Sequence, residues 1–192
     1  MKSFYCQLDY EHVPYPSPVG VKNGNIANNG CGVCSASMLV ENMLDVPYPP
    51  EEAAKEAKAC GAREGFGTDL YIYSPVVAKH FGLKLTVTED ADEALRFLQE
   101  GRGMVIANTQ GDRPADGYIG VFSDSGHYVV IAEAKGTTVK VWDPMYKLGS
   151  DRFDRPGRIG KVRLDGTDAY ADMSVLREDC KDRPFFLFEK AE

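Results

Sequence analysis

Residues 28–38 read Asn-Asn-Gly-Cys-Gly-Val-Cys-Ser-Ala-Ser-Met, a polar, glycine-rich segment that leads directly into an amphipathic one. Apolar or small side chains recur at the 3.6-residue period from Val33 to Leu44, which predicts a helix over about 32–44. Cys31 is therefore expected at a helix N-terminus, where unpaired backbone N–H groups and the helix dipole favour thiolate over thiol. We interpret Cys31 as a candidate nucleophile. The alternative is a small apolar side chain that happens to begin a helix.

The composition narrows the classes of partner. The chain has 192 residues and a net charge of −7, and its 22 Lys and Arg residues are dispersed, which argues against a nucleic-acid partner. No apolar run approaches the roughly 18 residues of a membrane span, and residues 1–20 are too polar and proline-rich for a signal peptide. We expect a cytoplasmic protein, or a secreted one if a leader has been removed. The oligomeric state is not indicated.

The cysteines indicate reduced thiols and no cofactor. There are five of them, an odd and scattered set that is unlike a disulfide framework. Cys31 and Cys34 are spaced C-x-x-C, but no second pair of ligands follows at zinc-site spacing. We therefore expect neither a structural zinc ion nor any other metal.

The rest of the chain predicts further helices and strands. The expected helices cover about 51–59, a third segment that begins at Thr68 or at Ser74-Pro75 and ends at 80–82, 89–98, and 168–177. The expected strands cover about 3–8, 83–87, 104–107, 161–164 and 184–188, and residues 108–125 form a long loop. We expect a single α+β domain over 1–192, with a helical part at about 30–100 and an antiparallel sheet at about 103–190.

The second informative stretch is residues 126–144, GHYVVIAEAKGTTVKVWDP, in which two β-branched runs flank a turn that contains Gly136. This pattern predicts a hairpin. A three-residue loop over 134–136 would pair Glu133 with Thr137 and place His127 opposite Asp143, so that an imidazole and a carboxylate share one face. The prediction depends on the turn, because a slip of one residue would separate the two side chains.

Taken in order, Gln7, Cys31 in NGCGVCSASM, His127 in SGHYVVI and Asp143 in VWDP resemble the papain-like cysteine peptidases. The resemblance is closest to the branch around the bacteriocin-leader-processing, or double-glycine, peptidase domains. It implies a papain-like fold, a peptide or protein substrate, and a Cys-His-Asp triad made of Cys31, His127 and Asp143. It also implies that the Gln7 side chain serves an oxyanion hole.

Two other functions stay open from the sequence. Cys31-Gly32-Val33-Cys34 at a helix start is also the pattern of a thiol-disulfide oxidoreductase, in which the second cysteine resolves a mixed disulfide. That function leaves His127 and Asp143 without a role. The other alternative is a non-catalytic binding module that retains a papain-like fold.

Overall fold

The structure, a computed structural model, describes residues 3–191. Its centre is a seven-stranded sheet with the order β3-β9-β4-β5-β6-β8-β7, in which every neighbouring pair is antiparallel. The strands are β3 (Leu83–Thr88), β4 (Gly103–Thr109), β5 (His127–Lys135), β6 (Thr138–Trp142), β7 (Arg163–Asp165), β8 (Asp168–Asp172) and β9 (Phe185–Lys190). A separate two-stranded hairpin pairs β1 (Arg63–Glu64) with β2 (Gly67–Thr68).

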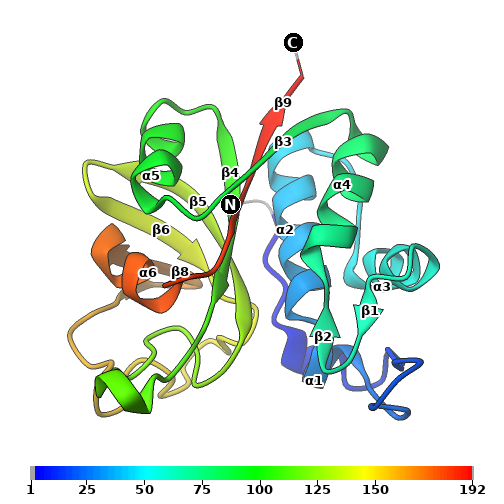
Figure 1. The fold of residues 1–192 in the computed structure, drawn as a ribbon, viewed down its shortest axis with the longest axis horizontal. Coiled ribbons are helices and arrows are strands. Elements are labelled where there is room, and N and C mark those ends of the chain that lie inside the picture. Colours follow the sequence, from blue (N-terminus) through cyan, green and yellow to red (C-terminus); the bar gives the residue numbers. More distant parts are fainter. Residues whose placement is uncertain (1–2, 192) are drawn as a thin grey trace.

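Helices cover both faces of the large sheet (Figure 1). On one side lie α2 (Cys31–Leu44), α3 (Pro50–Ala59) and α4 (Leu70–Phe81), preceded by the short α1 (Ile26–Asn29). On the other side lie α5 (Ala91–Gln99) and α6 (Met173–Asp179). Two 3-10 helices complete the fold, η1 (Gln7–Tyr10) and η2 (Pro114–Asp116). The expected α+β architecture, with helices packed on an antiparallel sheet, is confirmed.

The two-residue period of the strands distributes the core between these layers. In β9, Phe186 and Phe188 pack in the cluster with α2 and α4, whereas Phe185 and Leu187 pack in the cluster with α5 and α6. Strand β3 precedes residue 100 but pairs with β9 in the sheet. The expected division of the chain into a helical part before about residue 100 and a sheet part after about 103 is therefore not sharp: β3 lies in the first part of the chain but belongs to the sheet.

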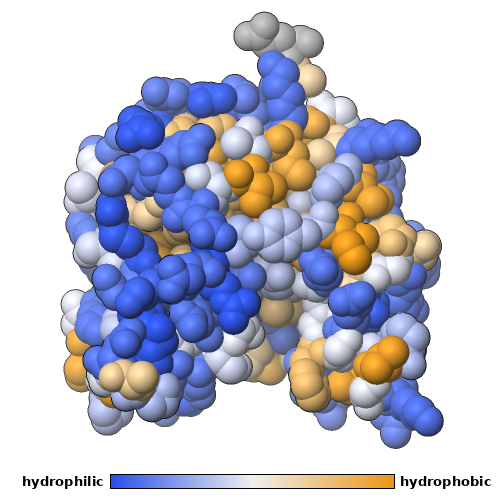
Figure 2. All heavy atoms as spheres, viewed as in Figure 1, coloured by the Kyte–Doolittle hydropathy of each residue, from blue (hydrophilic) through white to orange (hydrophobic). Residues whose placement is uncertain are grey.

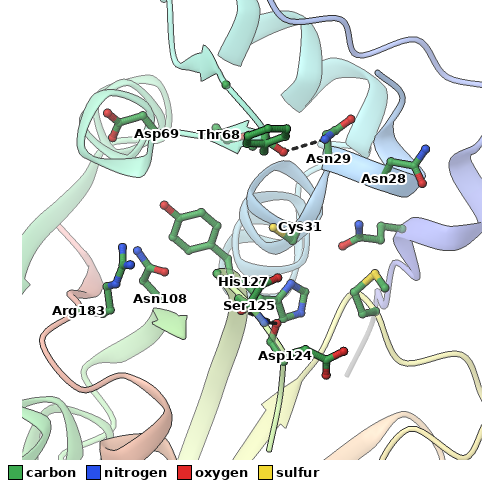
Figure 3. Close-up of a pocket in the computed structure, with 18 of the residues that line it drawn as sticks. Asn28, Asn29, Cys31, Thr68, Asp69, Asn108, Asp124, Ser125, His127 and Arg183 are labelled. Carbon is green, nitrogen blue, oxygen red and sulfur yellow. Dashed lines mark hydrogen bonds between the residues drawn. The ribbon is translucent and has the colours of Figure 1, made fainter. Parts of the chain in front are cut away.

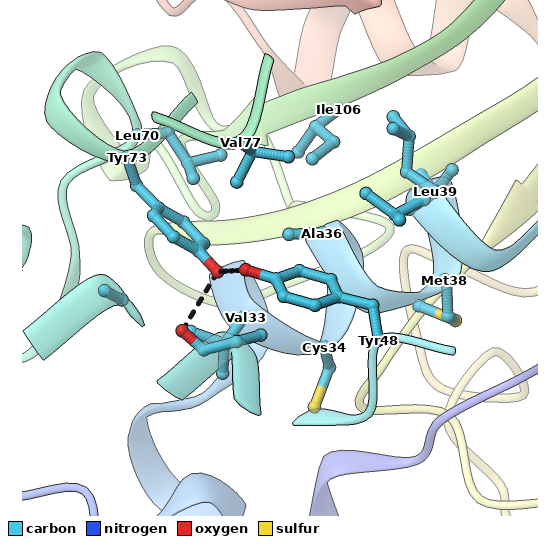
Figure 4. Close-up of a cluster of buried hydrophobic side chains, with 14 of the residues drawn as sticks. Val33, Cys34, Ala36, Met38, Leu39, Tyr48, Leu70, Tyr73, Val77 and Ile106 are labelled. Atoms are coloured by element: carbon cyan, nitrogen blue, oxygen red, sulfur yellow. Dashed lines mark hydrogen bonds between the residues drawn. The ribbon is translucent and has the colours of Figure 1, made fainter. Parts of the chain in front are cut away.

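Helix α2 is the element around which the first cluster is built. It is buried on nearly every side, from Gly32 to Glu41, as expected for a helix that runs through a core. Figure 4 shows its side chains Val33, Ala36 and Leu39 among residues from α4 and β4. The helix ends where Asp45 adopts a left-handed conformation at φ 60°, and prolines follow. This rigid helix fixes the position of its first residue, Cys31.

Three sequence predictions need correction. Residues 168–177 are not one helix: Ala169 and Ala171 are buried with a two-residue period, so 168–172 form β8, and Asp172 then caps α6. The third helix begins at neither Thr68 nor Ser74 but at Leu70, because Asp69 accepts a hydrogen bond from the Tyr71 N–H at 2.8 Å. The run 3–8 is not a strand, since η1 begins at Gln7.

Candidate active site

Glycines on both sides of Cys31 allow the close packing at the start of α2. A Cβ at Gly30 would lie 2.5 Å from the carbonyl oxygen of Ile26, so no larger residue fits there. A Cβ at Gly32 would lie 3.0 Å from the Cβ of Thr68 and 3.4 Å from the Tyr128 ring, so α2 touches both β2 and β5. Cys31 itself is partly exposed. Its sulfur points into a cleft in Figure 3.

His127 is the first residue of β5 and brings its imidazole to the same cleft. The ring is 5% exposed, and its Nε2 lies 2.7 Å from Oδ1 of Asp143. Because Nε2 is occupied by Asp143, Nδ1 is the ring nitrogen left to face Cys31, which lines the same cleft. The structure therefore places Cys31 and His127 at one cleft, with Asp143 bonded to the far nitrogen of the His127 ring.

Electrostatics of the buried site favour a charged Cys31–His127 pair. Burial alone would lower the pKa of His127, but the charge and hydrogen bond of Asp143 outweigh it and raise this pKa to about 9. Burial alone would raise the pKa of Cys31, but its hydrogen bond to His127 and the charge of that ring bring it below its ordinary value. The two shifts act in the directions that stabilise a thiolate beside an imidazolium.

Asp143 directly follows β6 and is fully buried. Its Oδ1 also accepts a hydrogen bond from the Met145 N–H at 2.8 Å, and its Oδ2 accepts one from Nε of Arg152 at 2.6 Å. Burial would raise the pKa of Asp143, but the positive charges of His127 and Arg152 lower it below its ordinary value. The carboxylate therefore stays ionised although it has no access to water.

Sequence analysis missed Arg152. It lies in an Arg-, Asp- and Gly-rich stretch, 149–166, that has no periodicity, and no local pattern connects it with Asp143. The only signal in the sequence was indirect. A buried carboxylate such as Asp143 usually needs a cationic partner, and the predicted hairpin offered none besides His127.

Gln7 lines the cleft from η1. Its Nε2 donates to the carbonyl oxygen of Ala27 at 2.7 Å, and this bond uses one of the two amide hydrogens. Its Oε1 is buried and has no hydrogen-bond partner within residues 3–191. The backbone N–H of Gln7 donates to the carbonyl oxygen of Pro144 at 2.7 Å, which ties η1 to the segment that carries Asp143. The bond to Ala27 leaves the second amide hydrogen of the Gln7 side chain unused.

The cleft that these side chains share has a volume of about 570 Å³. In the space-filling view, the lower edge of the molecule is hollowed between its two lower parts (Figure 2). The hairpin β1–β2 forms one wall, and residues 123–126 of the long loop form the other. Both signs of charge line it: Glu64, Asp69, Asp124, Arg152 and Arg183.

Cys34 does not share this cleft. It is fully buried in the core cluster, where Figure 4 shows it among apolar side chains. Burial raises the pKa of its thiol well above the ordinary value. A resolving cysteine must become a thiolate and reach a disulfide, so the location of Cys34 argues against the oxidoreductase alternative.

Within residues 3–191, no group of three or more His, Cys, Asp or Glu side chains is arranged to hold a metal ion. Among the helices of the same residues, none has the length and apolar character required to cross a bilayer.

Comparison with known proteins gives one family and several similar folds. The model of the Peptidase_C39-like family matches residues 4–157. No curated protein sequence matches the chain. Among solved structures, the fold is similar to the peptidase domain of Streptococcus ComA, a bifunctional ABC transporter involved in a quorum-sensing pathway. The TM-score is 0.54, the identity is 10%, and the match covers 84% of this chain and 91% of that one.

Two other solved structures are similar. One is a putative C39-like peptidase from Bacillus anthracis, with a TM-score of 0.51, 14% identity, and coverage of 95% of this chain and 96% of that one. The other is a double-glycine motif protease from an AMS/PCAT transporter in complex with the leader peptide, with a TM-score of 0.48, 14% identity and coverage of 84% of each chain. At these identities, the likeness to ComA and to the Bacillus anthracis protein bears on the fold.

Proposed function

Because the chain belongs to the Peptidase_C39-like family and is therefore a cysteine peptidase, we propose that Cys31, His127 and Asp143 form its catalytic triad. The observation that carries this proposal is the arrangement around His127: one ring nitrogen lies 2.7 Å from buried Asp143, and the other side of the ring interacts with Cys31 in an open cleft. The substrate is a peptide or protein whose scissile bond enters this cleft.

In the first half of the proposed reaction, the Cys31 thiolate attacks the carbonyl carbon of a peptide bond and a carbon–sulfur bond forms. The carbonyl π electrons move to oxygen. The second amide hydrogen of Gln7 and the backbone N–H of Cys31, which lies in the first turn of α2, supply two hydrogen bonds to this oxyanion. When the carbon–nitrogen bond breaks, the His127 imidazolium gives its proton to the leaving amine.

In the second half, neutral His127 removes a proton from water as the water attacks the thioester. The carbon–sulfur bond then breaks, the acyl part leaves as a carboxylic acid, and the Cys31–His127 ion pair is restored. Throughout the cycle, Asp143 holds the ring by its Nε2 and stabilises the imidazolium without accepting its proton.

The proposal is tested with a peptide-like electrophile that reacts only with an activated thiolate. Mass spectrometry of the digested protein should locate the adduct at Cys31. Cys60, which is also partly exposed but has no imidazole partner, is the control thiol within the same chain. Equal labelling of Cys60 and Cys31 at pH 6 would contradict the proposal, because an ordinary thiol is protonated at that pH.

A further inference from the structure

Arg152 is the only cation within hydrogen-bonding distance of Asp143 in the described part of the chain apart from His127. Its Nε donates to Oδ2 of Asp143 at 2.6 Å, and its Nη2 donates to the carbonyl oxygen of Phe122. The side chain is 13% exposed, so water screens this ion pair weakly. One guanidinium therefore joins the acidic member of the proposed triad to the long loop on the cleft wall.

The two oxygens of Asp143 are satisfied differently. Oδ1 accepts from both His127 and the Met145 N–H, whereas Oδ2 accepts from Arg152 alone among residues 3–191. Because Asp143 is fully buried, water does not reach this oxygen while Arg152 is in place. Loss of the guanidinium would leave an ionised oxygen without a donor in a site of low dielectric, which is costly.

The loop contact connects the same residue to the cleft. Residues 118–122 lie between the buried carboxylate of Asp179, which accepts from the N–H groups of Val121 and Phe122, and two arginines on the other side. Arg152 binds the carbonyl oxygen of Phe122, and Arg158 binds that of Gly120 at 2.8 Å. This loop continues through 123–126, which line the cleft, into His127. Arg152 and Arg158 thus share the loop, but only Arg152 touches Asp143.

The geometry points to Arg152 as a positioning residue of this active site, which keeps Asp143 ionised and oriented toward His127 while it anchors the cleft loop at Phe122. The inference rests on the proposed triad. Arg152 does not touch the reacting atoms and acts through Asp143.

Loss of Arg152 should change the ionisation of Cys31 in one direction only. Without Arg152, Asp143 either keeps an unbalanced negative charge or becomes protonated. In the first case the added negative potential opposes the Cys31 thiolate, and in the second case the His127 imidazolium loses its counter-charge and no longer stabilises that thiolate. Both cases raise the pH at which Cys31 ionises.

Other titratable groups act on Cys31 and Asp143 but stay neutral near neutral pH. They come from the N-cap of η1, the loop before α1, α2 and β5, and burial raises the pKa of each: Cys6, Tyr15, Cys34 and Tyr128. Among charged groups, His127 is the one whose contact and charge lower the pKa of Cys31. Glu64, Asp69, Asp124 and Arg183 also line the cleft, and the Arg152 variants leave these four side chains unchanged.

The test is the rate at which iodoacetamide alkylates Cys31 as a function of pH, with the adduct quantified by mass spectrometry. It compares the natural chain with Arg152→Met, Arg152→Lys and Arg158→Met. In Arg152→Met we expect the acid limb of the profile to move up by about one pH unit, and hence the rate on that limb to fall about tenfold. Arg152→Lys keeps the positive charge but cannot bind Asp143 and Phe122 at once, so its acid limb should lie between those of the natural chain and Arg152→Met. Arg158→Met, the matched control, should keep the natural profile.

Near-ultraviolet circular dichroism establishes that each variant is folded, and Arg152→Lys carries the test if Arg152→Met does not fold. Folded Arg152 variants with the natural acid limb would overturn the inference, as would an equal displacement in Arg158→Met. If the natural chain itself shows the profile of an ordinary thiol, the proposed triad fails. If the natural chain has an acid limb at low pH and no Arg152 variant displaces it, the proposed triad is retained and only the role of Arg152 is rejected.

Discussion

Asp143 lies diagonally across the β5–β6 hairpin from His127, and their side chains nevertheless meet at 2.7 Å. Val130 pairs with Trp142, so one further step of the register places Asp143 opposite Val129, not opposite His127. His127 and Val129 share a face of the strand because they are two residues apart. The imidazole therefore reaches along that face toward the carboxylate, while Arg152 approaches the carboxylate at its other oxygen.

Asp143→Asn should lower turnover by between about tenfold and 10⁴-fold without abolishing alkylation of Cys31. His127 and Arg152 bind different oxygens of Asp143, so in the variant the amide NH2 group, which cannot accept, would face one of them. The measurement is steady-state hydrolysis alongside iodoacetamide labelling. Unchanged turnover would mean that Asp143 is only a turn residue.

Cys31→Ala should abolish hydrolysis and leave the fold intact, because the thiol is partly exposed in the cleft and contributes little packing. Cys34→Ala is the matched variant in the same helix. It should retain activity while losing stability, since it removes a fully buried sulfur from the core. Activity assays and thermal unfolding of both variants check this pair of outcomes. Hydrolysis by Cys31→Ala, or none by folded Cys34→Ala, would be the opposite of what the site requires.

Hydrolysis and alkylation should respond differently to alkaline pH. The pKa of His127 is raised to about 9, so the ring carries its proton below that pH and loses it above. Hydrolysis needs this proton for the leaving amine and should decline as the pH passes about 9. Alkylation needs only the thiolate and should not decline there. Rates of both reactions between pH 5 and pH 10 measure the difference, and a parallel decline would argue against His127 as the acid.

Gln7→Ala should reduce kcat by about 10²- to 10³-fold if its amide binds the oxyanion. The loss of the bond to Ala27 should cost about 1 kcal/mol of stability. Gln7→Glu keeps the length of the side chain but replaces the amide donor with a carboxylate, so it should be at least as impaired. A modest change in kcat with a large change in KM would assign Gln7 to substrate binding instead.

The hairpin and the contact between His127 and Asp143 were predicted correctly, but the register that was expected to produce this contact was wrong. The loop has two residues, Gly136 and Thr137, so the partner of Glu133 is Lys140 instead of Thr137. That displacement of three positions would put His127 and Asp143 on opposite faces. The irregularity between Ile131 and Glu133 reduces the displacement of the register from three positions to two. Because an even displacement keeps each side chain on its face, His127 and Asp143 share a face again. A bulge is not visible in a run such as 127–135, so sequence reasoning could not place it.

The elements that could be predicted are those that short stretches of sequence determine. The start of α2 and the closing strand at 185–190 follow from patterns within a few residues. The cap at Asp69 is also a local signal, since Asp is a preferred N-cap residue, but Arg152 could not be found in this way. Arg152 reaches Asp143 only because the segment after β6 folds back on the sheet, and no periodicity describes that path.

The bond from the Gln7 N–H to the Pro144 carbonyl oxygen joins the beginning of the chain to a segment synthesised much later. Helix α2 can form early from local contacts, whereas closing so long a stretch of chain is entropically costly and slow. Refolding should therefore restore helical circular dichroism before it restores a reactive thiol. If the proposed triad is correct, Cys31 of a nascent chain should react like an ordinary thiol until Asp143 has left the ribosome and paired with His127.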